Sequence, residues 1–494
     1  MAEATLALCD LSATELRRLI GAKQLSPVEL LDACLARAAQ INRQVNGIVA
    51  VDEARARREA KEAEAAVMRG DALGPLHGLP MGIKDLVDTA GLRTTYGSPV
   101  FAQHVPDRDE RFVANLRRAG AIVCWKTNTP EWGAGGNTFN LVYGVSGNPF
   151  DPSLTCGGSS GGSAIALATG MLALCHGSDN AGSLRIPAAY CGVVGMRPTA
   201  GRVPSERRPT GLSHLMAEGP MARTARDTLM LLCAMAEDNW HDALATPRDP
   251  SLVPNPPELD LSTLRLAYSA DLGGFAQIEP SIRDVFARRI AAFRGAFRIA
   301  AEASPTFDGA DRAYEVLRAV NFAGIWTDRF REHPGQWGRL VGENLAAAAR
   351  FTVADVGAAL VRHTAIYQAA QDFFADFDLL ITPTVGIAPW PKHRIYPSAV
   401  GGAASANYFD WVRITYAITL INHPSISIPC GVDDRGLPFG LHIVGPRHGD
   451  AFVLRAAIAL EELFARQPEL GRPRPDITWL LAQPADDPLG RPVT

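Results

Sequence analysis

Lysine is scarce in this 494-residue sequence: only five of its 48 basic residues are lysines, at positions Lys23, Lys61, Lys84, Lys126 and Lys392. The other basic residues are arginines, so this chain uses arginine wherever a generic positive charge is sufficient. Because lysine can lose its proton at attainable pH and arginine cannot, a lysine kept in an apolar segment suggests a specific role. Lys84, in LPMGIKDLV, is such a residue. For Lys126 we expect only that it follows a strand and holds a loop by hydrogen bonds.

Cysteine motifs, charged runs and long apolar segments are also missing. The eight cysteines are scattered without a C-x-x-C pair, and no histidine lies in an H-E-x-x-H motif, which argues against a disulfide framework or a zinc site. The formal net charge is -4 and no arginine-rich run has interleaved aromatic residues, so nothing indicates a nucleic-acid partner. The N-terminus lacks a basic region followed by an apolar one, and no apolar run reaches membrane-spanning length. We therefore expect a cytoplasmic protein with reduced thiols, no metal or other cofactor, and no membrane partner.

The composition, 47% hydrophobic and 20% charged, is typical of a globular enzyme with one large α/β domain or two joined domains. Residues 1–70 are predicted to be helical. Ser12 and Ser26 are each followed three positions later by a glutamate, which is the pattern of a helix N-terminus, and DEARARREAKEAEAAVMR forms a third helix.

Beyond residue 70 the predicted strands and helices alternate. GPLHGLPMGIKD is a turn-rich loop beside a short strand, a helix is expected between Arg108 and Arg118, and AIVCW has the pattern of a buried strand. A surface connection rich in Pro and Asp occupies about 238–262. After it we predict the strands LRLAYS, DLLITPTV, SISIPCG and FGLHIVG, the last helix DAFVLRAAIALEELFAR, and helices around 280–298, 311–330 and 354–375. This alternation favours a mixed sheet covered by helices.

The stretch TCGGSSGGSA, from Thr155 to Ala164, places four glycines around two serines. Both Ser159 and Ser160 fit the G-x-S-x-G elbow of α/β-hydrolases, but that elbow needs a hydrophobic strand directly before it, and here the polar segment NPFDPSLT, expected to be a loop, precedes it. A phosphate-binding P-loop is excluded because no G-K-[ST] follows the glycines. Taken alone, the stretch is a flexible loop more often than an active site.

Two further motifs change that interpretation. Together with GIKD upstream and GSDNAGSLRIPAAYCGVVGMRPTAGRVP downstream, GGSSGGSA resembles the amidase signature family of serine hydrolases. In that family the second catalytic serine lies 24 positions after the first, which is the separation of Ser159 and Ser183 here. KTNTPEW, GPMARTARD, LLITPT and PSISIPCG extend the resemblance over nearly the whole chain.

The resemblance implies the architecture as well. It predicts a single domain over 1–494, with a large mixed β-sheet core covered by helices on both faces and a helical insertion that forms the pocket wall. Within it, 1–70 is the N-terminal helical segment and 71–237 the catalytic core. Residues 238–420 form the variable substrate-pocket region, and 421–494 return to the core.

Carried over by position, the resemblance makes Ser183 the nucleophile, Ser159 a bridging serine in a cis peptide, and Lys84 the ultimate base. A serine hydroxyl is a poor nucleophile until a neighbouring base takes its proton. Lys84 can accept that proton only when neutral, so its pKa must fall well below about 10.4, which burial can achieve. The flanking glycines would let the backbone fold tightly enough to aim Ser159 at Lys84.

The resemblance also implies an oxyanion hole made by the backbone N–H groups of Asn180, Ala181, Gly182 and Ser183. The family usually has glycine where Ala181 stands. If that residue must adopt positive φ, alanine would strain the loop, and Asn180 would be the residue able to absorb the turn.

Other residues of these motifs are expected to support the site. Arg197 stands where the family usually has lysine, and we expect that exchange to be neutral. His176 is expected to be a packed residue, and Cys156 and Cys191 to be small buried hydrophobes. The residues expected to support the proton relay and its loop are Ser160, Ser178, Asp179 and Arg185.

Substrate size is predicted from the aromatic residues of the variable region. Core packing is their default role, but inserted helices and loops form the pocket wall in this family, which favours a bulky apolar or aromatic substrate. These aromatic residues are Phe322, Trp326, Phe330, Trp337, Tyr396, Tyr408, Phe409 and Trp411.

The predicted protein is a cofactor-free hydrolase that cleaves a small-molecule amide through an acyl-enzyme on Ser183. Esters and carbamates (urethanes) pass through the same oxyanion and stay open as substrates. Two other functions also stay open: the amidase subunit of a tRNA-dependent amidotransferase, and a non-catalytic binding subunit. The oligomeric state also stays open, with a homodimer as one candidate.

Overall fold

A computed structural model describes residues 7–205, 208, 210–485, 487–491 and 493–494. Its centre is an eleven-stranded sheet with antiparallel pairs in the middle, parallel pairs on either side of them and one further antiparallel pair at the edge formed by Ile48–Val51. The predicted mixed sheet is therefore confirmed. In spatial order its strands are β1 (Ile48–Val51), β3 (Ile122–Thr127), β2 (Pro80–Lys84), β8 (Leu174–Asp179), β10 (Ala217–Ala222), β9 (Val194–Arg197), β16 (Ser425–Val432), β17 (Pro438–Val444), β13 (Leu379–Pro383), β11 (Arg265–Tyr268) and β12 (Ile299–Glu302).

Helices cover both faces of this sheet, as predicted. Successive side chains of a strand point to opposite faces, and in β3 Ile122 and Cys124 belong to one hydrophobic cluster and Val123 to another. The first cluster is completed by α6 (Gly161–Ala168) and α7 (Arg185–Cys191), and the second by α5 (Arg111–Arg118), α8 (Ala225–Met235) and α14 (Asp450–Phe464).

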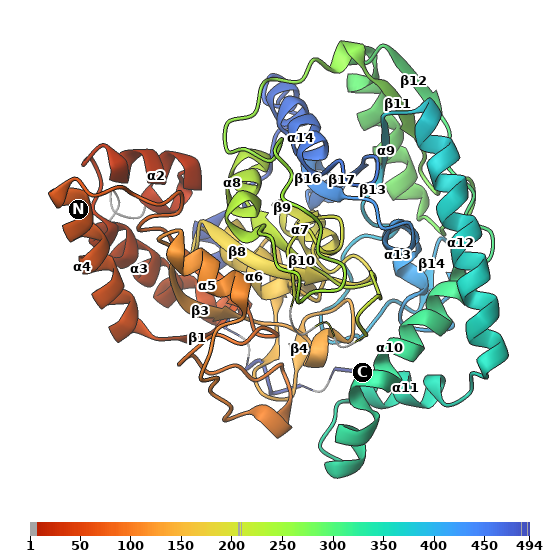
Figure 1. Cartoon of the computed structure of the whole chain (residues 1–494), viewed down its shortest axis with the longest axis horizontal. Coiled ribbons are helices and arrows are strands. Elements are labelled where there is room, and N and C mark those ends of the chain that lie inside the picture. Colours follow the sequence, from red (N-terminus) through yellow and green to blue (C-terminus); the bar gives the residue numbers. More distant parts are fainter. Residues whose placement is uncertain (1–6, 206–207, 209, 486, 492) are drawn as a thin grey trace.

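The N-terminal helices form one end of the molecule, on the left of Figure 1. They are α2 (Ala13–Gly21), α3 (Pro27–Val45) and α4 (Glu53–Arg69). The Ser12 hydroxyl accepts the Glu15 N–H, and Ser26 closes a capping box with Glu29. The three predicted helices are therefore confirmed, together with two of their caps.

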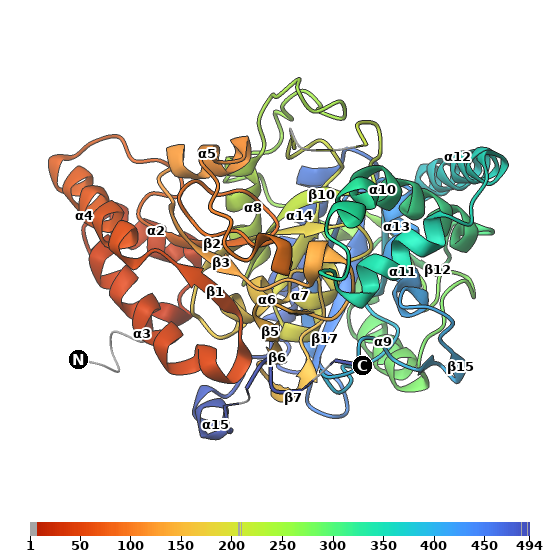
Figure 2. The ribbon, with the colours of Figure 1, turned by 90° about the horizontal axis from the view of Figure 1, so that it is seen from below.

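Residues between β12 and β13 form the helical segment at the opposite end of the molecule (Figures 1 and 2). It contains α10 (Ala310–Glu332), α11 (Arg339–Ala348) and α12 (Val353–Asp376). Helix α10 packs against α11, α12 and α13 (Arg413–Leu420) and lines the large cavity described below, which agrees with the predicted helical pocket wall. The remaining helices are α9 (Pro280–Phe293) and α15 (Ile477–Ala482), and the small two-stranded sheets are β4 (Phe139–Asn140) with β5 (Gly144–Val145), β6 (Gly147–Asn148) with β7 (Asp151–Thr155), and β14 (Ala399–Val400) with β15 (Ala403–Ala404).

Three predicted boundaries differ from the structure. NPFDPSLT is not wholly a loop, because its last five residues form β7; the turn before them is made by the Asn148 side chain, which accepts the Phe150 N–H. The helix expected at 280–298 ends at Phe293, where the chain turns to enter β12. The helix expected from Arg108 begins at Arg111.

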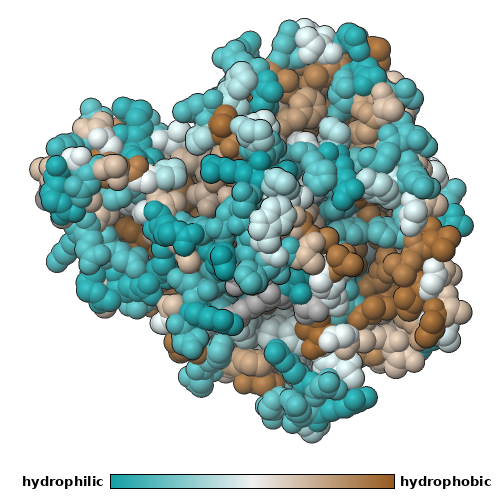
Figure 3. Space-filling view, viewed as in Figure 1, coloured by the Kyte–Doolittle hydropathy of each residue, from teal (hydrophilic) through white to brown (hydrophobic). Residues whose placement is uncertain are grey.

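Apolar side chains are exposed over the outer side of this helical segment, as Figure 3 shows at its right. Val353, Leu360 and Val361 of α12 are all exposed. Within the described residues no single helix has the length and apolar composition needed to cross a membrane, and one pair, Arg339–Ala348 with Val353–Asp376, meets both criteria only when its helices, bent by 98°, are taken together.

Candidate active site

Lys84 ends β2 in the middle of the sheet, and its side chain is completely buried. Its amino nitrogen Nζ lies 2.6 Å from the Ser159 hydroxyl oxygen, 2.9 Å from that of Ser160 and 3.0 Å from that of Ser178. The amine thus faces three neutral hydroxyls, and no carboxylate of the described chain makes an ion pair with it.

Burial decides the charge of this amine. Desolvation lowers the pKa of Lys84 to about 7, while the negative charges of Glu218 and Asp179 act in the opposite direction. A lysine with this pKa is largely neutral at slightly alkaline pH. It can then accept a proton, which an ordinary lysine cannot do.

Ser159 is held against Lys84 by a tightly packed turn that leads into α6. The Gly158–Ser159 peptide bond is cis. A side chain at Gly162, which begins the next turn, would place its Cβ 2.1 Å from the Asn128 backbone nitrogen and 2.5 Å from the Gly47 carbonyl oxygen. The glycines therefore allow close packing of backbone on backbone, and the stretch is not a loose loop.

Ser183 lies in the turn between β8 and α7. Its hydroxyl makes no hydrogen bond to any residue that the structure describes, and it lines the same cavity as Ser159 and Ser178. The Ser183 carbonyl accepts the Ser160 N–H at 3.2 Å, which ties the two serine loops together. Ser183, the nucleophile proposed from the sequence, is thus the serine of this site whose hydroxyl has no hydrogen bond to the described chain.

The loop before Ser183 offers fewer free N–H groups than the sequence implied. The Gly182 N–H donates to the Asp179 carboxylate at 2.8 Å, so in this structure it is not free to act as the oxyanion donor that the sequence predicted. The N–H groups of Asn180, Ala181 and Ser183 have no acceptor among the described residues. These three remain the candidate donors.

The expected strain at Ala181 is absent. Among the described residues of this loop, only Gly182 has positive φ, at 122°. A Cβ on Gly182 would also lie 2.5 Å from the Thr415 hydroxyl oxygen. The position that needs glycine is therefore 182, and Ala181 and Asn180 lie outside the left-handed region.

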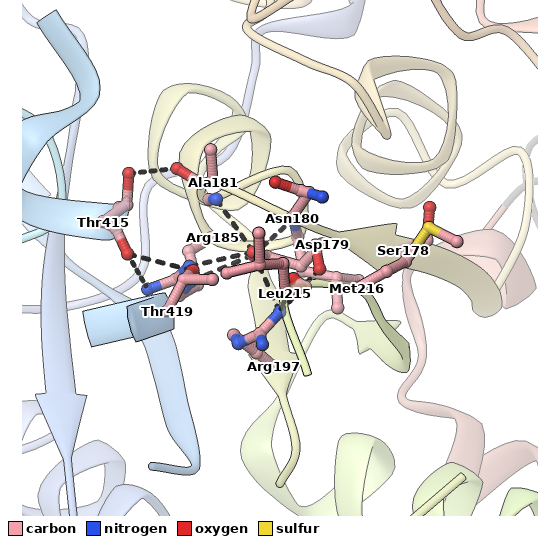
Figure 4. Close-up of polar contacts among 12 residues, drawn as sticks. Ser178, Asp179, Asn180, Ala181, Arg185, Arg197, Leu215, Met216, Thr415 and Thr419 are labelled. Carbon is pink, nitrogen blue, oxygen red and sulfur yellow. Dashed lines mark hydrogen bonds and ion pairs between the residues drawn. The ribbon is translucent and has the colours of Figure 1, made fainter. Parts of the chain in front are cut away.

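Asp179 organises this loop, as Figure 4 shows. Its carboxylate accepts two hydrogen bonds from the Arg185 guanidinium, at 2.8 and 3.0 Å, and also accepts the Leu184 N–H. All of these groups are buried, and the arginine charges hold the pKa of Asp179 far below its usual range against the effect of burial. Asp179 and Arg185, both expected to support this loop, do so as a buried ion pair.

Arg197 has a larger structural role than the sequence suggested. Its guanidinium is fully buried and donates to the carbonyl oxygens of Asp179, Leu215 and His214 at 2.6, 3.0 and 2.7 Å. A lysine ammonium has no planar fork and could not match this geometry. The expectation that arginine in place of the family's usual lysine makes no difference was therefore incomplete.

His176 is buried and packs against Phe112, as predicted. Its Nε2 also lies 2.8 Å from the carboxylate of Glu218, a buried residue of β10 that lines the large cavity. The sequence analysis did not identify Glu218, because nothing in the segment around it signals a charge beside the relay. Lys126 donates to the Val87 carbonyl at 2.5 Å, which confirms its predicted loop-holding role.

The serine hydroxyls line a cavity of about 470 Å³. One wall is aromatic: the ring centroids of Tyr96 and Trp132 are 4.4 Å apart, and those of Trp132 and Trp326 are 3.9 Å apart. Phe101 and Phe322 complete this wall. Tyr96, Phe101 and Trp132 come from the N-terminal half and were not predicted, although Trp132 belongs to the KTNTPEW motif.

A smaller recess of about 30 Å³ adjoins Ser183 on the side of the loop. Tyr408 and Phe409, two of the aromatic residues expected to form the pocket wall, line this recess. Phe330 and Trp337 pack in the cluster around Trp326, and Trp411 packs against Trp390. The predicted aromatic wall is therefore divided between two cavities and the core.

Among the residues that the structure describes, no group of three or more His, Cys, Asp or Glu side chains is placed to hold a metal ion.

Comparison with known proteins places this geometry in context. Residues 29–454 match the family model described as Amidase. The acylamidase of Rhodococcus erythropolis is 34% identical over 461 residues, covering 91% of this chain and 95% of that protein. One subunit of the glutamyl-tRNA(Gln) amidotransferase of Geobacillus thermodenitrificans is 31% identical over 486 residues, covering 92% of this chain and 98% of that protein. The crystal structure of a bacterial aryl acylamidase of the amidase signature family superposes with a TM-score of 0.83 at 25% identity, covering 98% of this chain and 99% of that one.

Proposed function

This chain belongs to the amidase signature family, and from that premise we propose that it hydrolyses small linear amides through an acyl-enzyme formed on Ser183. The observation that carries the proposal is the buried Lys84 amine, 2.6 Å from the hydroxyl of Ser159, which lines the same cavity as the open hydroxyl of Ser183. A base of this kind is what a serine nucleophile requires.

In the proposed first step, the Ser183 oxygen bonds to the substrate carbonyl carbon as its proton passes through the Ser159 hydroxyl to neutral Lys84. The carbonyl oxygen becomes an oxyanion, which the N–H groups of Asn180, Ala181 and Ser183 stabilise. One preorganised donor of this kind typically lowers the barrier by about 3 kcal/mol.

The relay then runs in reverse. The C–N bond breaks as the proton returns from Lys84 through Ser159 to the leaving nitrogen, so that a neutral amine departs. A water molecule attacks the acyl-enzyme with the same base, and the acid is released with Ser183 restored. Ser160 and Ser178 hold the Lys84 amine in line through their hydroxyls, 2.9 and 3.0 Å away.

The substrate we propose carries an aromatic or bulky apolar group. The stacked rings of Tyr96, Trp132 and Trp326 give the 470 Å³ cavity an apolar wall near the serines. Two of the similar proteins are named acylamidase and aryl acylamidase, which is in keeping with such a substrate. Esters and carbamates of similar shape are further candidate substrates, because the same oxyanion forms from each.

The proposed function is tested by a hydrolysis screen over anilides, aliphatic amides, nitrophenyl esters and carbamates, together with labelling by a fluorophosphonate. We expect labelling and turnover to be lost in Ser183→Ala, by at least roughly 10⁴-fold in kcat. Ser153→Ala, which removes an exposed hydroxyl, is the matched control. Labelling that persists in Ser183→Ala would disprove the assignment, and absence of labelling in the wild type would favour a non-catalytic binding subunit.

The similarity to one amidotransferase subunit supports a second candidate function, in which ammonia from an amide donor passes to a partner protein. That function predicts glutamine as the preferred donor and co-purification with another chain. If the protein purifies alone, hydrolyses anilides and ignores glutamine, this second function is excluded. The homodimer and the cytoplasmic location remain predictions, the first to be tested by light scattering.

A further inference from the structure

Arg318, on helix α10, is a cation buried beside the proposed nucleophile. Its side chain lines both the 470 Å³ cavity and the 30 Å³ recess, and Ser183 and Asn180 line both as well. Only 7% of Arg318 is exposed. The guanidinium therefore lies where the two cavities meet, next to the reacting carbonyl.

No carboxylate of the described chain forms an ion pair with this guanidinium. Its Nη2 donates to the Tyr408 hydroxyl, and its plane lies over the rings of Phe322 and Tyr408, 4.9 and 5.3 Å from their centroids. Its Nε has no hydrogen-bond acceptor. Neutral aromatic partners and one unused donor leave the charge uncompensated.

Three other buried arginines of this protein are compensated by carboxylates. Arg185 pairs with Asp179, Arg202 with Asp450 and Arg208 with Asp242. Keeping a cation out of water without an anion is unfavourable, and burial lowers the pKa of Arg318 accordingly. An arginine that lines a cavity and has no anionic partner in the protein is a binding group for an anion supplied by the ligand.

The positions of the serines indicate which part of the substrate carries that anion. Ser159 and Ser178, the relay side of the site, line the large cavity and not the recess. In the proposed mechanism the leaving nitrogen receives its proton from Ser159, so the amine part lies in the large cavity against Trp132 and Trp326. The acyl part then extends from Ser183 toward Arg318, which lines both the large cavity and the 30 Å³ recess.

We propose that Arg318 binds a carboxylate at the far end of a short acyl chain, so that the preferred substrates are aromatic half-amides of short dicarboxylic acids. This proposal rests on the proposed function and names its substrate class. The reaction consumes one water: the C–N bond breaks, the arylamine leaves with the Ser183 proton, and hydrolysis of the acyl-enzyme releases the dicarboxylate. The carboxylate on Arg318 takes no part in the bond changes and positions the carbonyl carbon.

The test compares succinic mono-4-nitroanilide with its primary-amide isostere, in which an uncharged carboxamide replaces the carboxylate. Release of 4-nitroaniline gives kcat/KM for each. We expect the wild type to prefer the anion by about 10- to 100-fold, the range for a hydrogen bond to a charged group. In Arg318→Met this ratio should approach one, and in Arg318→Lys it should be intermediate. Arg312→Met, which removes an exposed arginine from the same helix outside both cavities, should keep the ratio.

A wild type without preference for the anion, or a preference that survives in Arg318→Met, would overturn the proposal. Inhibition of the wild type by succinate and by butyrate gives a measure that needs no variant: succinate should inhibit more strongly by a similar factor, and equal inhibition would also contradict the proposal. Failure of the proposed function looks different, because then neither nitroanilide releases 4-nitroaniline.

Discussion

Glu218 lies directly opposite Ser178 in the antiparallel pair of β8 and β10, and the Ser178 hydroxyl is one of the three that contact the Lys84 amine. A negative charge is thus built into β10, which is separated from the strand of the proposed base, β2, by β8 alone. It favours the ammonium form of Lys84, while burial favours the neutral form. The balance of these two effects sets the pH range in which the relay can work.

The wild-type enzyme is expected to lose activity below neutral pH. Because the base must be neutral and burial lowers the pKa of Lys84 to about 7, kcat/KM should fall about tenfold for each pH unit below that value. Lys84→Arg keeps a permanent charge and should be inactive at every pH. A flat pH–kcat/KM profile between pH 5 and 8 would refute Lys84 as the base.

Glu218→Gln should move the acid limb of that profile to lower pH. Removing the negative charge destabilises the ammonium form, so the pKa of Lys84 falls further. The glutamine oxygen can still accept from His176, which limits structural damage. Asp434→Asn, at an exposed position paired with Arg288, is the control and should leave the limb in place. If the acid limb of the Glu218→Gln profile stays at the wild-type pH or moves to higher pH, this account is contradicted.

Gly182→Ala and Ala181→Gly should have opposite outcomes although they exchange the same two residues. Gly182 has φ of 122° and would carry a Cβ 2.5 Å from the Thr415 hydroxyl oxygen, so alanine there should displace the loop and lower kcat by roughly 10²-fold or more. Ala181 does not use a left-handed conformation, so glycine there should cost at most about 1 kcal/mol of stability. Steady-state kinetics and thermal unfolding of both variants measure this contrast. Equal losses of kcat in the two variants would contradict the prediction.

Arg197→Met should strongly destabilise the fold. The methionine leaves the carbonyl oxygens of Asp179, Leu215 and His214 without their donor, and breaking a buried charged network costs about 3–5 kcal/mol. Arg197→Lys should lose less stability, since lysine keeps the positive charge and lacks only the planar arrangement of the guanidinium donors. Urea unfolding measures both, with the exposed Arg435→Met as the control. Indistinguishable stabilities of the Arg197 variants and the control would show that the network is dispensable.

Trp326→Ala should raise KM for anilides by about tenfold, because an aromatic ring buried against Trp132 is lost from the cavity wall. For acetamide, which does not reach that wall, KM should change much less. Trp479→Ala removes a partly exposed ring outside both cavities and serves as the control. An equal rise for both substrates would mean that Trp326 does not contact the aromatic group.

Local sequence signals predicted most of the secondary structure. The capping residues Ser12 and Ser26 marked helix starts because a cap depends only on residues three or four positions apart. The boundaries that were missed depend on distant parts of the chain. The helix expected at 280–298 stops at Phe293 because β12 must pair with β11, which no local pattern reveals.

The candidate site divides in the same way. The relay residues Lys84, Ser159 and Ser183 were predicted, because each lies in a motif whose spacing is visible along the chain. Glu218 and Arg318 were missed, since each stands in an unremarkable segment and reaches the site only through strand pairing or helix packing. The Gly182 N–H was predicted to be an oxyanion donor, but it already donates to the Asp179 carboxylate, which only side-chain geometry could show.

The sequence by itself determined the family, the sheet-and-helix plan and the candidate relay residues, because these follow from residue types at fixed separations. Tertiary structure alone decided the charge state of the Lys84 amine, the number of free backbone donors and the shape of the pocket. Those properties depend on burial and on neighbours up to several hundred positions away, and no local stretch of the chain contains that information.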